Sequence, residues 1–181
     1  MRSKGQLSTS RTGSYVFPTN KPWLRGEHPG ASDELPLYLT DSSIWIGARK
    51  HPGTYLPRLL VDRIAGDEVA TCVPIALEVL TGPPSGAELD QDWTAVWQHL
   101  SWLPIGDTTM NRAVELLRGL AHTTDGAHRR RPIDYIIAAC AEATDDVILW
   151  HWDNDLTVIC DFAEIAQEAE HPRAVAHGIS D

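Results

Sequence analysis

The chain has 181 residues, of which 43% are hydrophobic and 22% charged, values typical of one ordinary globular domain. Its formal net charge is −10, which argues against a general nucleic-acid-binding protein, since such proteins are normally basic. No apolar run approaches the roughly 20 residues of a membrane span, and the N-terminus lacks a signal-peptide core, so we expect a cytoplasmic protein that does not enter a membrane.

The charge is spread unevenly along the chain. Residues 1–36 carry five basic and three acidic residues and are rich in Ser, Thr, Gly and Pro without a sustained periodicity. We therefore predict a flexible N-terminal extension over residues 1–36, a folded domain over residues 37–170 and a C-terminal tail over residues 171–181.

Short strands and helices alternate through the first half of this domain. An apolar run ends at Asp41 and is followed by serines that can cap a helix, and Pro74 suits the first turn of a helix that carries Glu78. We predict strands at residues 37–41 and 69–73, and helices at residues 43–49, 56–64 and 75–80.

The second half continues the alternation. Met110, Ala113, Val114 and Leu117 form a clean helical stripe after Asp107. We predict helices at residues 87–100, 107–122 and 132–142, strands at residues 102–105, 147–151 and 156–159, and a polar helix before the tail. Cys72, Cys140 and Cys160 lie in apolar runs without disulfide or zinc spacing and are predicted to be reduced core residues.

The most informative stretch is residues 129–142, in which three arginines lead into Pro132 and an almost entirely apolar helix. A helix that is apolar on nearly every face is normally buried. Asp134 lies in its first turn, where the macrodipole favours a carboxylate. This aspartate therefore marks the point where a buried helix meets solvent.

The alternation predicts an α/β fold, a three-layer sandwich with a short, mainly parallel sheet flanked by helices. Ligands bind such sheets beyond the carboxyl ends of the strands. We expect four acids from separate segments to lie together at this edge of the sheet: Asp41, Glu78, Asp134 and Asp153.

Carboxylates gathered in this way raise one another's pKa unless a cation intervenes. Mg²⁺ takes oxygen ligands, and a bound ion can activate water for phosphodiester hydrolysis. Ser43 could hold one acid or a water, while Arg129, Arg130 and Arg131 would supply the positive patch that an RNA substrate needs.

With these motifs in place, the chain resembles PIN-domain ribonucleases, and among them the VapC-type toxins of bacterial toxin–antitoxin pairs. The resemblance covers residues 37–165. It is carried by Asp41 with Ser42-Ser43, by residues 74–82, by Pro132-Ile133-Asp134 with the apolar helix after it, and by residues 151–155.

The resemblance implies a Mg²⁺- or Mn²⁺-dependent endoribonuclease that is usually a homodimer and is inhibited by a VapB-type antitoxin. The family's four acids fall on Asp41, Glu78, Asp134 and Asp153, and its hydroxyl residue falls on Ser43. Asp155 is an alternative to Asp153 as the fourth acid of the metal site.

Several alternatives accompany this interpretation. A catalytically silent PIN-like module could hold an antitoxin or nucleic acid. Asp153-Asn154-Asp155-Leu156-Thr157 fits the Asp-x-Asp-x-Thr pattern of haloacid-dehalogenase-like phosphatases, but only 26 residues follow Asp155. His151 could assist a proton transfer or be structural, and Trp45 and Trp152 could stack on a splayed base or pack in the core.

Overall fold

The computed structural model describes residues 36–123 and 126–170. The predicted extension and tail therefore lie outside the described residues, apart from Pro36. The strands are β1 (Leu37–Thr40), β2 (Val69–Thr71), β3 (Ser101–Trp102), β4 (Val147–His151) and β5 (Gln167–Ala169). The helices are α1 (Ser42–Lys50), α2 (Leu56–Ala65), α3 (Val73–Leu80), α4 (Gly86–Ala95), the 3₁₀ helix η2 (Trp97–His99), α5 (Asp107–Thr123), α6 (Pro132–Glu142) and α7 (Asn154–Ala163).

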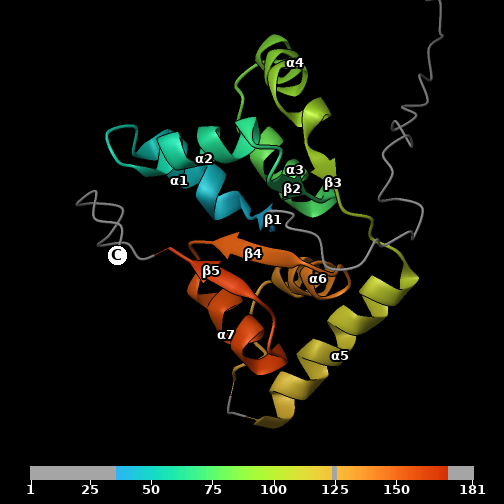
Figure 1. The fold of residues 1–181 in the computed structure, drawn as a ribbon. Coiled ribbons are helices and arrows are strands. Elements are labelled where there is room, and N and C mark those ends of the chain that lie inside the picture. Colours follow the sequence, from blue (N-terminus) through green and yellow to red (C-terminus); the bar gives the residue numbers. More distant parts are fainter. Residues whose placement is uncertain (1–35, 124–125, 171–181) are drawn as a thin grey trace, which may run out of the picture. The chain divides into compact units, whose positions relative to one another are not determined.

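The five strands form one sheet in the order β3-β2-β1-β4-β5, and every neighbouring pair is parallel (Figure 1). From β1 the chain moves outward through β2 to β3, and then returns to β4 on the other side of β1. The strand order therefore reverses between β1 and β4. In open parallel sheets, this reversal opens the crevice in which ligands bind.

Helices cover both faces of the sheet. Figure 1 shows α1, α2, α3 and α4 grouped on one side and α5, α6 and α7 on the other, and the closest helix packing agrees, with α5 and α7 against α6, and α1 against α2 and α3. The predicted α/β sandwich is confirmed, and its sheet is entirely parallel.

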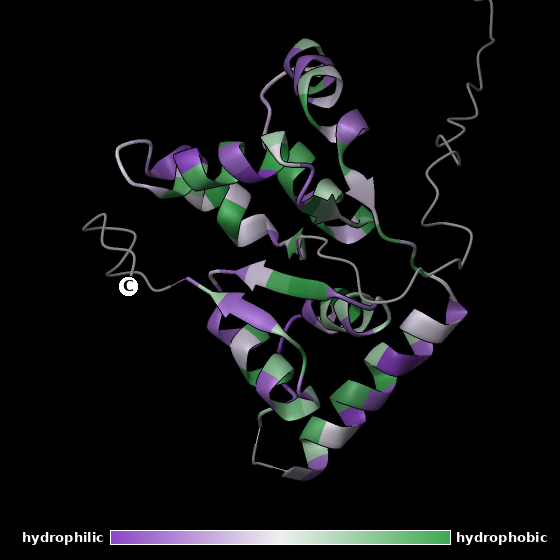
Figure 2. Ribbon diagram, in the orientation of Figure 1, coloured by the Kyte–Doolittle hydropathy of each residue, from purple (hydrophilic) through white to green (hydrophobic). Residues whose placement is uncertain are grey.

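The core is built where the sequence is most apolar. Most of β4 is hydrophobic in Figure 2, and its Leu149 and Trp150 are fully buried. Helix α6 buries nearly every residue after Asp134, as predicted for a helix apolar on all faces. The three cysteines are free and buried, which confirms their assignment to the core.

The strand predicted at residues 102–105 is the shorter β3 at Ser101–Trp102, and the strand predicted at residues 156–159 is absent. Residues 156–159 lie in α7, because the Asp153 carboxylate accepts a hydrogen bond from Asp155 N at 2.7 Å and caps a helix there. Leu156, Ile159 and Cys160, at i, i+3 and i+4 spacing, are fully buried by this helix. The polar helix expected after them is also wrong, since the chain instead forms the edge strand β5.

The helix predicted at residues 87–100 is shorter than expected, because α4 ends at Ala95 and a 3₁₀ turn follows. Among the described residues, no helix combines the length and apolar character needed to cross a membrane.

Candidate active site

Four acidic residues meet at the carboxyl edge of the sheet. Asp41 directly follows β1, and Asp153 follows β4, the strand hydrogen-bonded to β1. Glu78 lies in α3, which follows β2, and Asp134 lies in the first turn of α6. These positions surround the place where the strand order reverses.

Among the described residues, one carboxylate oxygen of Asp41 is held by a hydrogen bond and the other has no hydrogen-bond partner. It is fully buried, and its Oδ2 accepts a hydrogen bond from Ser43 N at 2.8 Å as the N-cap of α1. Its Oδ1 is buried and has no hydrogen-bond partner among the described residues. Burial raises the pKa of this carboxyl above its ordinary value. An oriented carboxylate oxygen without a donor is a suitable cation ligand.

Arg131, the N-cap residue of α6, joins the other three acids. Its Nη2 lies 2.9 Å from Asp134 Oδ1 and 3.4 Å from Asp153 Oδ2, and its Nη1 lies 3.2 Å from Glu78 Oε1. The guanidinium thus neutralises part of a cluster of carboxylates that would otherwise repel one another.

Asp134 is fully buried at the start of α6. Burial raises the pKa of its carboxyl to about 6, with Arg131 opposing this change and Asp153 adding to it. A cation bound beside this carboxyl would lower its pKa again, so that it would be ionised at neutral pH.

The two serines after β1 have different roles. Ser42 Oγ donates a hydrogen bond to Glu78 Oε2 at 2.7 Å and so orients that carboxylate. Ser43 Oγ accepts a hydrogen bond from Trp152 N at 2.8 Å and so joins α1 to the segment after β4. The sequence predicts the supporting role for Ser43 alone, whereas in the structure Ser42, directly beside the first acid, orients Glu78.

Asp155 and the other two arginines lie around this cluster. Arg130 Nε lies 3.4 Å from Asp155 Oδ1, and its side chain is only 14% exposed. Arg129 is exposed. Within the described residues, Asp153 shares the Arg131 guanidinium with the other acids, whereas Asp155 has its ion pair with Arg130.

The donors at this rim fit a hard divalent cation, because they are carboxylate oxygens and one buried oxygen lacks a partner. In the described part of the chain, however, no three His, Cys, Asp or Glu side chains converge closely enough to hold a metal ion as they stand. Three of the acids are turned toward Arg131. Metal binding would require these carboxylates to turn from the guanidinium.

A surface pocket of about 340 Å³ adjoins the acids. It lies between α1, Arg131 and the segment after β4, and is lined by Ser42, Ser43, Ile46, Gly47, Lys50, His51, Arg131, Trp152 and Asp153. Lys50 and His51 were missed from the sequence, since nothing in a helix end nine residues beyond Asp41 indicates that it faces the rim.

The aromatic residues near the rim separate into core and surface residues. Trp45 is 6% exposed and its Nε1 donates to Thr40 O at 3.1 Å, so it packs in the core. His151 is fully buried between Gln167 and the backbone of Asp153. Trp152, in contrast, lines the pocket.

Comparison with known proteins finds related sequences and folds. The family model for the PIN domain matches residues 38–161. Ribonuclease VapC18 of Mycobacterium tuberculosis is 28% identical over 120 residues, which make up 66% of this chain and 84% of the relative.

Two solved structures have a similar fold. The DNA-bound VapBC structure from Salmonella typhimurium matches with a TM-score of 0.55 and 14% identity, over 75% of this chain and 98% of that one. VapBC2 from Rickettsia felis, bound to a DNA fragment from its promoter, matches with a TM-score of 0.52 and 17% identity, over 75% of this chain and 99% of that one.

Proposed function

Because the chain belongs to the PIN domain family, we propose that it is a metal-dependent endoribonuclease that acts as the toxin of a toxin–antitoxin pair. The observation that carries this proposal is the meeting of four carboxylates from four segments where the strand order reverses. A buried, unpartnered Asp41 oxygen in that cluster suits a cation. The similarity to a ribonuclease of the VapC type supports RNA as the substrate.

In this proposal Asp41, Glu78, Asp134 and Asp153 would hold Mg²⁺ or Mn²⁺, which would supply Lewis-acid chemistry for phosphodiester hydrolysis. The chain's own contribution is to fix these carboxylates: Asp41 through Ser43 N, Glu78 through Ser42, and Asp153 through its capping of α7. Asp153 is favoured over Asp155 as the fourth acid, because Asp155 pairs with Arg130.

The three arginines remain a proposed RNA-binding patch, with unequal parts. Arg129 is exposed and free to contact phosphates, and Arg131 is half exposed beside the acids. Arg130 is largely buried and is better suited to orient Asp155 than to bind RNA directly.

We further propose that residues 37–170 act as the nuclease domain, that the protein works in the cytoplasm as a homodimer, and that a VapB-type antitoxin inhibits it. Both structural neighbours are VapBC assemblies, which supports this partner.

The test is cleavage of an end-labelled RNA mixture by the purified full chain with Mg²⁺, with Mn²⁺ and with EDTA. We expect cleavage only with metal, and a loss of at least about 100-fold in Asp134→Asn with the fold retained in circular dichroism. Arg112→Gln is the matched control, because Arg112 pairs with Glu142 away from the acids. Equal cleavage by Asp134→Asn would refute the proposed site, and absence of any cleavage would favour the catalytically silent module.

A further inference from the structure

The pocket beside the acids combines two features that single-stranded RNA requires. Part of its lining is aromatic and apolar, and part is cationic, with the Asp153 carboxylate beside the cationic Arg131. Single-stranded RNA is commonly bound by bases splayed onto aromatic rings and by phosphates lying against basic side chains. The chemistry of the lining therefore matches one nucleotide of a flexible strand.

The aromatic side is formed by His51 and Trp152. Their ring centroids lie 5.6 Å apart and the ring planes meet at 52°, so they form an open corner and not a closed stack. Both rings line the pocket, and Ile46, which is 36% exposed, adds apolar surface. A flat base placed in this corner would cover hydrophobic surface that water now contacts.

Trp152 is held in place by two separate contacts with α1. Ser43 Oγ accepts its backbone N–H at 2.8 Å. The absence of a side chain at Gly47 lets the ring pack onto the helix, since a Cβ there would come within 2.9 Å of Trp152 Cε3. A fixed ring costs little conformational entropy when a base stacks on it.

The cationic side is formed by Lys50 and Arg131. Lys50 is exposed and has no carboxylate partner within residues 36–123 and 126–170. Arg131 lines the pocket together with Asp153, which it contacts at 3.4 Å. A phosphate near Arg131 would thus lie beside the proposed metal site, and the neighbouring phosphate would lie near Lys50.

The pocket also has a suitable size. Its volume of about 340 Å³ lies at the lower end of the roughly 300–1,000 Å³ of pockets that hold small ligands. Such a space is large enough for one nucleotide.

From these observations we propose that the pocket binds a single nucleotide of the RNA next to the cleaved bond, with its base against Trp152 and His51 and its phosphate against Lys50. The proposal rests on the proposed ribonuclease function and adds a subsite that contributes to RNA sequence preference.

The first test measures RNA binding without cleavage. The full chain in EDTA is titrated against fluorescein-labelled 12-nucleotide oligouridylate and oligoadenylate, and binding is followed by anisotropy. We expect Trp152→Ala to weaken binding by about 5- to 100-fold, the range found for loss of one stacked base. Trp152→Phe should retain most of the affinity, and Val61→Ala, at a residue 62% exposed on α2, should bind as wild type.

A second variant tests the cationic side without altering the aromatic ring. Lys50→Gln should reduce the slope of log affinity against log salt by about 0.7, the value for one phosphate contact on a single strand. This change is independent of whether Trp152→Ala folds normally.

Photo-crosslinking then places the base. A 12-nucleotide RNA carrying 5-iodouridine is irradiated with the full chain in EDTA, and the crosslinked peptide is identified by mass spectrometry. We expect crosslinks at Trp152 or His51. Crosslinks only at other residues, or unchanged RNA affinity in folded Trp152→Ala, would overturn the pocket proposal even if metal-dependent cleavage is intact.

Two outcomes distinguish nucleotide binding in the pocket from the ribonuclease function and from protein docking. Failure of the wild-type protein to cleave RNA would refute the ribonuclease function, whereas the binding tests address the pocket alone because they use no metal. If Trp152→Ala instead loses binding to an antitoxin but keeps its RNA affinity, the pocket is a protein-docking site and the nucleotide proposal is wrong.

Discussion

The Arg131 guanidinium lies 2.9 Å from Asp134 Oδ1, three residues further along the chain at the start of the same helix. The same group also contacts Glu78 and Asp153, so a cation supplied by the protein stands among the proposed metal ligands. It stabilises the cluster without metal, and a divalent ion must compete with it.

The first prediction follows from this competition. Arg131→Gln should bind Mn²⁺ about fivefold more tightly than wild type, because a half-exposed ion pair contributes on the order of 1 kcal/mol. The metal-free melting temperature should fall at the same time, since the acids lose their counter-ion. Isothermal titration calorimetry and thermal unfolding measure both effects. Arg112→Gln is the control, and equal metal affinity in the two variants would contradict this view of Arg131.

The second prediction concerns pH. The folded-state pKa of Asp134, about 6, lies above its ordinary value of 3.8, so the folded state binds the proton more tightly than the unfolded state. Protonation of Asp134 therefore stabilises the folded state fully below pH 3.8, and this stabilisation is lost as the pH rises through 6. Asp134→Asn should remove this loss, which is on the order of 2 kcal/mol, and so flatten the stability profile between pH 4 and 6. Urea unfolding in EDTA across this range provides the measurement, and parallel profiles would exclude Asp134 as the source.

The sequence predicts best those elements whose signals lie within a few neighbouring residues. The apolar run before Asp41 and the Pro132 start of α6 predicted their elements well, because burial and capping are encoded within a few residues. The strand predicted at residues 156–159 is absent, although three of these four residues are β-branched. The capping carboxylate of Asp153 determined α7 instead.

The residues of the site were likewise predictable from local patterns only in part. The four acids could be placed at one rim, because the carboxyl ends of parallel strands meet there. The contact of Arg131 with Glu78 spans 53 positions and depends on how α3 and α6 pack, which no local pattern records. The Lys50 and His51 side of the pocket depends in the same way on tertiary structure.

The third prediction separates the two serines. Ser42→Ala removes the donor that orients Glu78, so metal affinity or cleavage should fall by about 10-fold or more, as is typical for groups that orient metal ligands. Ser43→Ala keeps the backbone N–H that binds Asp41 and loses the hydroxyl, which accepts Trp152 N and also hydrogen-bonds the Asp41 carboxyl. Its metal affinity should change less than that of Ser42→Ala. The reverse order, measured by calorimetry with Mn²⁺, would restore Ser43 as the supporting hydroxyl.

The fourth prediction uses Gly47. Replacement by alanine improves helix propensity by up to about 1 kcal/mol, but the new Cβ would lie 2.9 Å from Trp152 Cε3 and must displace that ring. We expect the free energy of unfolding to change little and the RNA affinity to fall. Gly86→Ala in α4 is the matched control, because its added Cβ meets no atom within 4 Å. Unchanged RNA affinity in Gly47→Ala would show that the position of the Trp152 ring is unimportant for binding.

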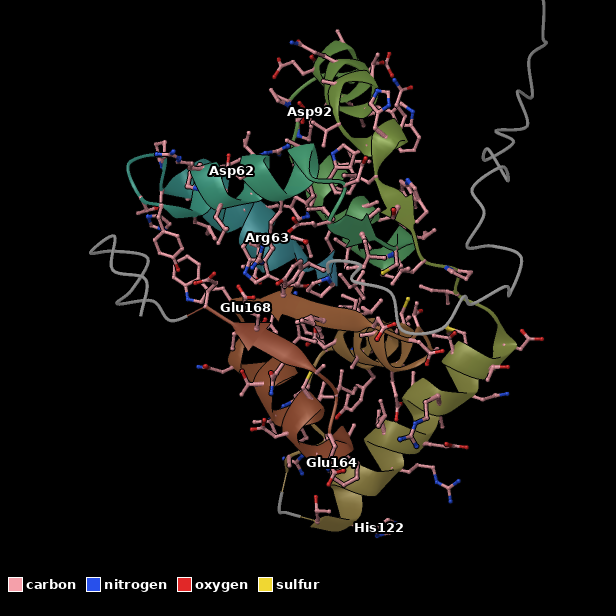
Figure 3. All side chains as sticks on the ribbon, viewed as in Figure 1. Asp62, Arg63, Asp92, His122, Glu164 and Glu168 are labelled. Atoms are coloured by element: carbon pink, nitrogen blue, oxygen red, sulfur yellow. The ribbon has the colours of Figure 1, made fainter. Side chains whose placement is uncertain are left out.

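The fifth prediction addresses the joint between α2 and the edge strand β5. Figure 3 labels its two members, Arg63 and Glu168, whose Nη2 and Oε1 are 2.9 Å apart. The guanidinium carbon also lies 3.6 Å from the ring centroid of Tyr38 and 4.2 Å from that of Trp150. Arg63→Ala removes the ion pair, both ring contacts and much packing, and we expect a loss of about 2–3 kcal/mol in urea unfolding.

Glu168→Gln provides the comparison that identifies the cause. It leaves Arg63 between the two rings and weakens only a pair whose acid is 38% exposed, so its cost should stay below about 1 kcal/mol. If the two variants were equally destabilised, the ion pair and not the ring contacts would account for the stabilisation by Arg63. Because β5 pairs with β4, which leads directly to Asp153, loosening this joint should also lower metal affinity in Arg63→Ala more than in Glu168→Gln.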